Sequence, residues 1–262
     1  TKNGNPSQIN ASSAADAAYT VTVNEAAVCL DFVMDGPGAG NNVTWAGSSA
    51  LAISGSLNLI GGSTDITRTY TGAITFNSTA TGKTLTFNSL TMANATTFNG
   101  AGGGWTVQGT WNNGTSAITL TAGTLDTNGQ TVTCGTLTTT GSTTRALTLG
   151  ASTINVVFWN GSSNTNMTFS ENTSTISLSG ASPNLATPSG GETFNNITLA
   201  GVTSGSFAIS GTLTCANFTI TGIASSVNVS LNNVGGTITV TGALTLSGNN
   251  ANTQRLHVGK SV

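Results

Sequence analysis

Short runs in which hydrophobic and polar residues alternate strictly make up most of this chain. Leu147 and Leu149, for example, flank Thr148. An alternation with a period of two predicts β-strands that bury one face and expose the other. No comparable stretch has helical spacing. The alternating runs are Leu57 to Leu59, Ala73 to Phe76, Thr84 to Phe87, Ile118 to Thr121, Thr131 to Cys134, Ala146 to Leu149, Thr175 to Leu178, Asn196 to Leu199, Phe207 to Ile209, Thr212 to Cys215, Phe218 to Ile220, Val227 to Val229, Thr237 to Val240 and Ala243 to Leu246.

The runs are separated by Gly-containing dipeptides and share a repeated phrase. Gly-Thr-Leu-Asp-Thr stands at 123–127, Gly-Thr-Leu-Thr-Thr at 135–139 and Gly-Thr-Leu-Thr-Cys at 211–215. A phrase repeated with drift indicates a repeat architecture, so we expect an all-β fold, a parallel β-solenoid or β-helix. Turns of roughly twenty residues would give about a dozen coils and a rod ~55 to 60 Å long. A β-sandwich also contains many short alternating strands and is the alternative.

The chain divides into a short N-terminal segment and one repeat domain. Residues 1–18 lack alternation, and we expect them to form an arm or linker. Residues 19–262 would form the β-repeat domain. Its most apolar run, residues 26–34, predicts a buried strand or a short helical cap over an open end of the solenoid. The chain begins without Met and stops inside a repeating pattern, as expected of a processed product or a fragment.

Charged residues make up only 5% of the 262 residues, against about a quarter in ordinary soluble domains. This deficit leaves 8 Asp plus Glu, 6 Lys plus Arg and one His to supply acid, base or nucleophile chemistry. A hydrophobic content of 37% is too high for a disordered chain. We therefore expect a folded protein that is not an enzyme.

The same composition restricts partners and cofactors. A net charge of -2 without clustered Lys or Arg argues against nucleic-acid binding, and no apolar run is long enough for membrane insertion. Cys29, Cys134 and Cys215 lie far apart without CxxC or Cys/His spacing. They are interpreted as small core hydrophobes, and we expect no metal and no cofactor.

Few carboxylates are placed to act together. Asp31 and Asp35 are the closest pair along the chain, but four residues on one strand span about 13 Å, which is too far for an acid pair in glycoside hydrolysis. Asp126 precedes Asn128-Gly129 and is interpreted as a turn residue. His257 has no nucleophile motif beside it.

The four tryptophans are the candidate binding residues. An aromatic ring in hydroxyl-rich surroundings suits stacking against a sugar. Packing inside the protein, at the corners of the coils, is the alternative interpretation for two of them, Trp105 and Trp111. The glycan-stacking candidates are Trp45, Trp105, Trp111 and Trp159.

Several phrases resemble a known class of repeat protein. They are Thr79 to Thr86, Thr97 to Gln108, Ala122 to Cys134, Ser142 to Gly150 and Asn252 to Leu256. These segments are similar to Thr/Ser/Gly-rich β-solenoid repeat proteins of tailed-phage virions and environmental bacterial surface proteins. The resemblance implies fibres, decorations or adhesive appendages, and it brings no agreed catalytic residues.

Three functions are consistent with this picture. The first is a non-catalytic extracellular structural protein, a building block of a virion fibre or decoration or of a surface filament, whose partners are its own copies or other structural proteins. The second is a glycan-binding adhesin module that recognises cell-envelope glycans. The third is a tailspike-like polysaccharide depolymerase, which would require two carboxylates to meet in a groove. The carboxylates considered for that role are Asp65, Asp126, Glu171 and Glu192.

Overall fold

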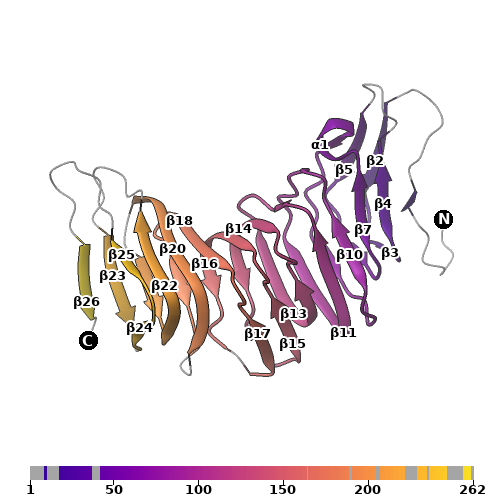
Figure 1. Ribbon diagram of the computed structural model, residues 1–262. Helices are drawn as coiled ribbons and strands as arrows, with labels where there is room; N and C mark the ends of the chain where they lie inside the picture. The colour runs from indigo at the N-terminus through magenta and orange to yellow at the C-terminus, as the bar shows by residue number, and fades with distance from the viewer. Residues whose placement is uncertain are drawn as a thin grey trace.

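The protein is a parallel β-solenoid of about nine turns, seen in a computed structural model that describes residues 9–10, 18–36, 42–163, 165–188, 191–204, 207–221, 229–234, 236–246 and 256–260 (Figure 1). Every strand pair recorded among these residues is parallel, as between β14 and β16 or β20 and β22. The expected solenoid is confirmed, and the β-sandwich alternative is wrong because it requires antiparallel neighbours. The chain passes repeatedly over three faces, in the order face 3, face 1, face 2.

Face 1 carries the longest continuous ladder. Its strands are β3 (Ala27–Cys29), β6 (Leu51–Ile53), β9 (Ile74–Phe76), the first parts of β11 (Thr96–Gln108) and β13 (Ala117–Asp126), the second parts of β14 (Thr131–Thr138) and β16 (Thr153–Asn160), then β19 (Asn184–Ala186), β21 (Phe207–Ser210), β23 (Val229–Val234) and β26 (Leu256–Lys260).

Face 2 follows face 1 around each corner. Its strands are β1 (Ile9–Asn10), β4 (Phe32–Asp35), β7 (Leu57–Ile60), β10 (Lys83–Thr86), the second parts of β11 and β13, β15 (Arg145–Thr148) and β17 (Met167–Ser170), then the first parts of β20 (Glu192–Ser204) and β22 (Leu213–Thr221), and β24 (Ile238–Val240).

Face 3 completes each turn. It begins with a separate three-stranded sheet and a single helical turn, α1 (Gly62–Asp65), and continues in the main sheet. Its strands are β2 (Tyr19–Val23), β5 (Val43–Gly47), β8 (Ile66–Arg68), β12 (Trp111–Asn112), the first parts of β14 and β16, β18 (Thr175–Ala181), the second parts of β20 and β22, and β25 (Leu244–Leu246).

The turns are fewer and more variable than the expected dozen of about twenty residues. The offset between paired residues ranges from 19 positions, for Ala117 and Thr136, to 28, for Leu57 and Leu85. With a strand spacing of ~4.8 Å, about nine turns give a rod of roughly 43 Å. The loops at the corners, which differ in length, account for the difference.

The alternating pattern places the hydrophobic residues inside. On β16, Ile154 and Val156 are buried while Thr153 and Asn155 lie half-buried on the outer side. The interior contains aromatic pairs from neighbouring turns, such as Trp45 stacked on Tyr70 at 4.7 Å between ring centroids. Glycine serves tight corners, and Gly123 of β13 is one, with a φ of 86° and no room for a side chain beside the Gly100 carbonyl.

Two segments of the N-terminal region, the expected arm or linker and the apolar run 26–34, contain strands. Ile9 pairs with Phe32 and Asn10 with Val33, so part of the expected arm forms strand β1, while residues 1–8 and 11–17 lie outside the described residues. The apolar run 26–34 forms strands β3 and β4 of the first turn, which confirms the buried-strand interpretation over the helical one. Cys29 points into the core and is 1% exposed.

Candidate functional site

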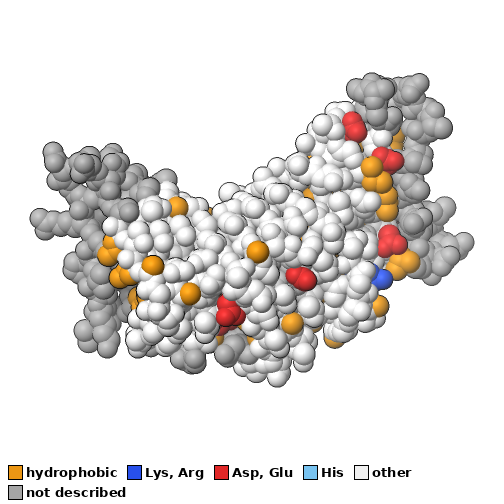
Figure 2. Space-filling model, in the orientation of Figure 1, with side chains coloured by type: hydrophobic (Ala, Val, Ile, Leu, Met, Phe, Trp, Pro, Cys, Tyr) orange, Lys and Arg blue, Asp and Glu red, His pale blue; other side chains and the backbone are white. Residues whose placement is uncertain are grey.

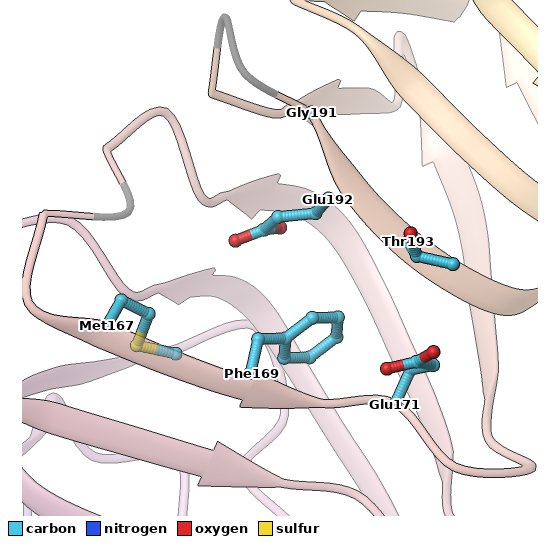
Figure 3. Close-up of a pocket in the computed structure, with 6 residues that line it drawn as sticks. All are labelled: Met167, Phe169, Glu171, Gly191, Glu192 and Thr193. Carbon is cyan, nitrogen blue, oxygen red and sulfur yellow. The ribbon is translucent and has the colours of Figure 1, made fainter.

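The ladder of face 2 is interrupted between β17 and β20. β17 pairs with β15, and the first part of β20 pairs with β22, but no pairing joins β17 to β20 among the described residues of this face. At the same level, faces 1 and 3 continue through the β16–β19 and β16–β18 pairs. A cavity of about 320 Å³ occupies the interruption (Figure 3). It is lined by Met167, Phe169, Glu171, Gly191, Glu192 and Thr193.

Charged side chains occupy inward-facing positions around this opening. Glu192 pairs with Leu213, which is fully buried in the next turn. Phe169 and Glu171 are two residues apart and therefore point to the same side, and Figure 3 shows both directed toward β20. Arg145, Glu171 and Glu192 are the only charged residues in the sequence between positions 127 and 254. Nearly half of the chain thus has all its charged side chains in one place.

Glu192 is a buried carboxyl with an unused hydrogen-bonding atom. Its side chain is only 7% exposed, and its Oε2 accepts no hydrogen bond from any described residue. Burial raises the pKa of Glu192 from 4.5 to about 7, against the opposing effects of the Trp159 indole N–H and the Arg145 charge. Near neutral pH the group is therefore a mixture of carboxylic acid and carboxylate, and it points into the cavity (Figure 3).

Arg145 supports the corner beside the cavity. Its guanidinium donates to the backbone carbonyls of Thr139, Thr143, Ser163 and Thr165, at 2.8 Å for the last two. Its side chain is 1% exposed, and desolvation lowers its pKa. With the guanidinium bonded to carbonyls, Arg145 acts on Glu192 through its charge and not through a direct contact.

The other residues that line the cavity are of two kinds, the apolar Met167 and Phe169 and the polar Glu171 and Thr193. Met167 and Phe169 are half-buried, so each presents part of its side chain to the cavity. Phe169 packs edge-on against Trp159 at 5.7 Å between centroids and contacts Phe194 at 5.4 Å, which fixes its ring. Glu171 is half-buried and Thr193 exposed. The opening therefore offers a fixed ring face, two carboxyls and a hydroxyl.

The ladder of face 3 is also interrupted, between β8 and β12, and there the chain's own residues occupy the space. Between β8 and β12 the space contains the backbone near Met92, whose amide donates to the Asn112 carbonyl at 2.8 Å, and polar side chains that bond backbone carbonyls. Arg68 donates to the Thr91 carbonyl at 2.7 Å, Asn94 donates to the Gly72 carbonyl at 2.8 Å, and Asn113 donates to the Asn94 carbonyl at 2.9 Å. The gap on face 2 contains the Glu192 Oε2 atom, the one carboxyl oxygen among the eight buried side-chain polar atoms that have no geometric hydrogen bond among the described residues.

The structure places the tryptophans differently from the glycan-stacking expectation. Trp45, Trp105, Trp111 and Trp159 are at most 1% exposed, so none presents a ring face to solvent. They pack against aromatic neighbours inside the solenoid, as Trp111 does against Phe87 at 4.9 Å. The expectation that they stack on sugars is wrong, because inward alternation buries each of these rings in the core.

The carboxylates considered from sequence separate into structural groups and the cavity pair. Asp31 accepts a hydrogen bond from the Ser56 amide at 2.7 Å, and Asp126 accepts one from the Asn128 amide at 2.7 Å, which confirms the turn interpretation of Asp126. Asp65 lies in α1, at the other end of the rod (Figure 1). Glu171 and Glu192 are the two of the four depolymerase candidates that meet in one cavity.

Phe169, Met167 and the buried state of Glu192 were not anticipated from the sequence. The sequence does contain a sign of this site. Met-Thr-Phe-Ser-Glu at 167–171 and Glu-Thr-Phe at 192–194 alternate like strands, but Glu171 and Glu192 stand at positions where the pattern places a hydrophobic residue. In a chain with so few charges, a carboxylate on the hydrophobic side of an alternating run is the informative observation.

Other chemistry is restricted among the residues that the structure describes. Cys29, Cys134 and Cys215 are free and buried, which confirms their interpretation as core residues. In the described ranges, no group of three His, Cys, Asp or Glu side chains is close enough to hold a metal ion. The same ranges contain no helix with the length and hydropathy needed to cross a membrane.

The outer surface of the rod is formed mainly by hydroxyl and amide side chains. Figure 2 shows few acidic or basic groups on the visible face. The chain matches no protein-family model, and comparisons with curated proteins and with solved structures find no match.

Proposed function

We propose that this protein is a non-catalytic extracellular structural rod, a building block of a virion or cell-surface appendage. The observation that carries the proposal is the continuous stack of parallel coils with an apolar interior and an outer face of uncharged Thr, Ser and Asn. Such a stack is stiff along its axis because each turn is hydrogen-bonded to the next on several faces. A stiff, weakly charged rod suits display or spacing more than turnover.

Within the part of the chain that the structure describes, the free edge of β25 (Leu244–Leu246) supports assembly with other copies of the chain or with similar structural proteins. Leu244 and Leu246 of β25 pair with the buried Phe218 and Ile220 and so face the core side, yet they are 57% and 48% exposed. On face 3, β25 is paired on one side only among the described residues. An open strand edge with exposed apolar side chains favours addition of a further strand.

Sedimentation velocity over a concentration series, followed by electron microscopy, tests the proposal. We expect the chain to form end-to-end assemblies, and the double variant Leu244→Lys with Leu246→Lys to reduce them. A matched control, Ile60→Lys, changes an exposed apolar residue on the side of the rod and should leave assembly unchanged. A chain that stays monomeric at all concentrations would contradict the proposal.

A further inference from the structure

We propose that the opening between β17 and β20 is a carbohydrate-binding site, in which the Phe169 ring packs against the apolar face of a sugar and the Glu192 carboxyl hydrogen-bonds its hydroxyls. This inference goes beyond the structural role and does not depend on it. It rests on four features of the described residues: the interruption of face 2, the cavity, the fixed ring and the free Oε2 atom.

The unpartnered Glu192 carboxyl is the strongest of these features. A buried polar atom without a hydrogen bond destabilises the fold, so a folded protein normally satisfies it. The gap on face 3 between β8 and β12 contains hydrogen bonds from Arg68, Asn94 and Asn113, which shows that this chain can fill an interruption with its own side chains. At face 2 the Glu192 side chain lines the cavity, and a sugar hydroxyl bound there would share its carboxyl with the neighbouring Trp159 indole N–H.

The lining matches a sugar in shape and polarity. Small-molecule sites usually have volumes of about 300–1,000 Å³, and they combine an apolar surface with a few polar groups. The cavity of about 320 Å³ lies at the lower end of that range, suitable for one sugar unit of a longer glycan. Phe169 supplies the apolar surface, and Thr193 and Glu171 stand at the rim as further hydrogen-bonding groups.

Charge favours a neutral hydroxylated ligand over a cationic one. A carboxyl with a pKa of about 7 is partly protonated at neutral pH, so it both donates and accepts hydrogen bonds, as sugar hydroxyls do. An ammonium group can only donate. The positive charge of Arg145, which acts on Glu192, also opposes a cation at this position. The chemistry therefore points to a glycan and not to a lysine-rich peptide.

A glycan array followed by isothermal titration of the best ligand tests the site. We expect the intact chain to bind at least one glycan. Phe169→Leu, which gives the residue found at the paired position 147, should weaken binding by up to about tenfold because the packing of the ring against the sugar is lost. Glu192→Leu, which gives the residue at the paired position 213, should abolish binding while the fold is kept. Glu25→Gln, at an exposed carboxylate far from the cavity, is the control and should bind as the unaltered chain does.

The outcomes separate this inference from the structural role. No binding across the array, or unchanged binding in both cavity variants, would overturn the site and leave the assembly proposal untouched. Chemical shift changes at the Glu192 carboxyl with methylammonium but with no sugar would also overturn it. Release of new reducing ends from a bound oligosaccharide would support the carbohydrate site and would overturn the non-catalytic assignment. Circular dichroism of each variant confirms that it is folded.

Discussion

The Trp159 indole nitrogen and the Glu192 carboxyl lie against the same side of Gly161. A Cβ atom at residue 161 would lie 2.8 Å from the indole Nε1 and 2.9 Å from the carboxyl Oε2. The Trp159 indole N–H lies close enough to the Glu192 carboxyl to oppose the rise in its pKa, and the Trp159 side chain is held in the core at 0% exposure. The position of the Glu192 carboxyl therefore depends on the absence of a side chain at Gly161.

Gly161→Ala should displace Glu192. The added methyl group is too close to both atoms, and the carboxyl is the more flexible of the two, so it should turn toward solvent in the cavity. We expect the pKa of Glu192 to fall and the protein to lose about 1 kcal/mol of stability through crowding. NMR titration with ¹³C-labelled glutamate and thermal unfolding measure the two effects. An unchanged titration and an unchanged Tm would show that residue 161 does not position the carboxyl.

Stability should fall as the pH rises through the range in which Glu192 ionises. The unfolded chain releases this proton near pH 4.5, whereas the folded protein holds it up to about pH 7. The free energy of unfolding should therefore decrease between these values by up to about 3 kcal/mol. Urea unfolding at a series of pH values, compared between the unaltered chain and Glu192→Gln, isolates this contribution from that of the other acids. A difference between the two proteins that does not change with pH would disprove the linkage.

Loss of Arg145 should destabilise the corner that it supports. Arg145→Met leaves the carbonyls of Thr139, Thr143, Ser163 and Thr165 without this donor, and we expect a cost on the order of 3 kcal/mol. Arg145→Lys should recover only part of it, because an ammonium group cannot reproduce the planar set of donors. Chemical unfolding measures both variants.

A charge-removing control accompanies the Arg145 variants. Lys83→Met removes a half-buried positive charge on face 2 for which no hydrogen bond to a side chain is recorded among the described residues, and we expect a change of about 0.5 kcal/mol or less. Equal losses for Lys83→Met and Arg145→Met would mean that net charge, and not the hydrogen bonds to carbonyls, determines the effect.

The three thiols should be inert in the folded protein. Burial raises the pKa of Cys29 to about 11, of Cys134 to about 12 and of Cys215 to about 11, with the nearby Asp31 adding to the effect at Cys29. Only the thiolate is an effective nucleophile, so a disulfide reagent at pH 8 should label the protein slowly. Three thiols should react once the chain is unfolded in urea. Rapid labelling of any one of them under native conditions would contradict the burial.

The sequence was sufficient for the fold class because solenoid packing is largely local. Alternation at Leu147, Thr148 and Leu149 predicts which side of the strand is buried, and the repeated Gly-Thr-Leu phrase predicts stacking. The number of turns was overestimated because corner loops vary in length, as the 28-residue step from Leu57 to Leu85 shows. The alternating pattern locates the strands, but it does not predict how many residues the loops between them contain.

The candidate site was harder to predict than the fold. The tryptophans were considered for binding because of their chemistry, but alternation alone predicts that an inward ring such as Trp159 is buried. Glu171 and Glu192 are two of the four carboxylates considered for a depolymerase, and the structure brings these two, which the sequence does not single out, to one cavity. The cavity itself could not be foreseen, because it depends on the absence of strand pairing between β17 and β20, residues far apart in the sequence.

The interruption of face 2 also has a mechanical consequence. At this level the C-terminal turns are joined to the rest of the rod through two ladders, of three residue pairs at β16–β19 and four at β16–β18. Under a pulling force along the axis, two ladders carry the load at this level, where an uninterrupted level has three. A glycan bound between β17 and β20 would contact both strands and bridge the gap. The rod would then resist pulling best while it is bound to its glycan.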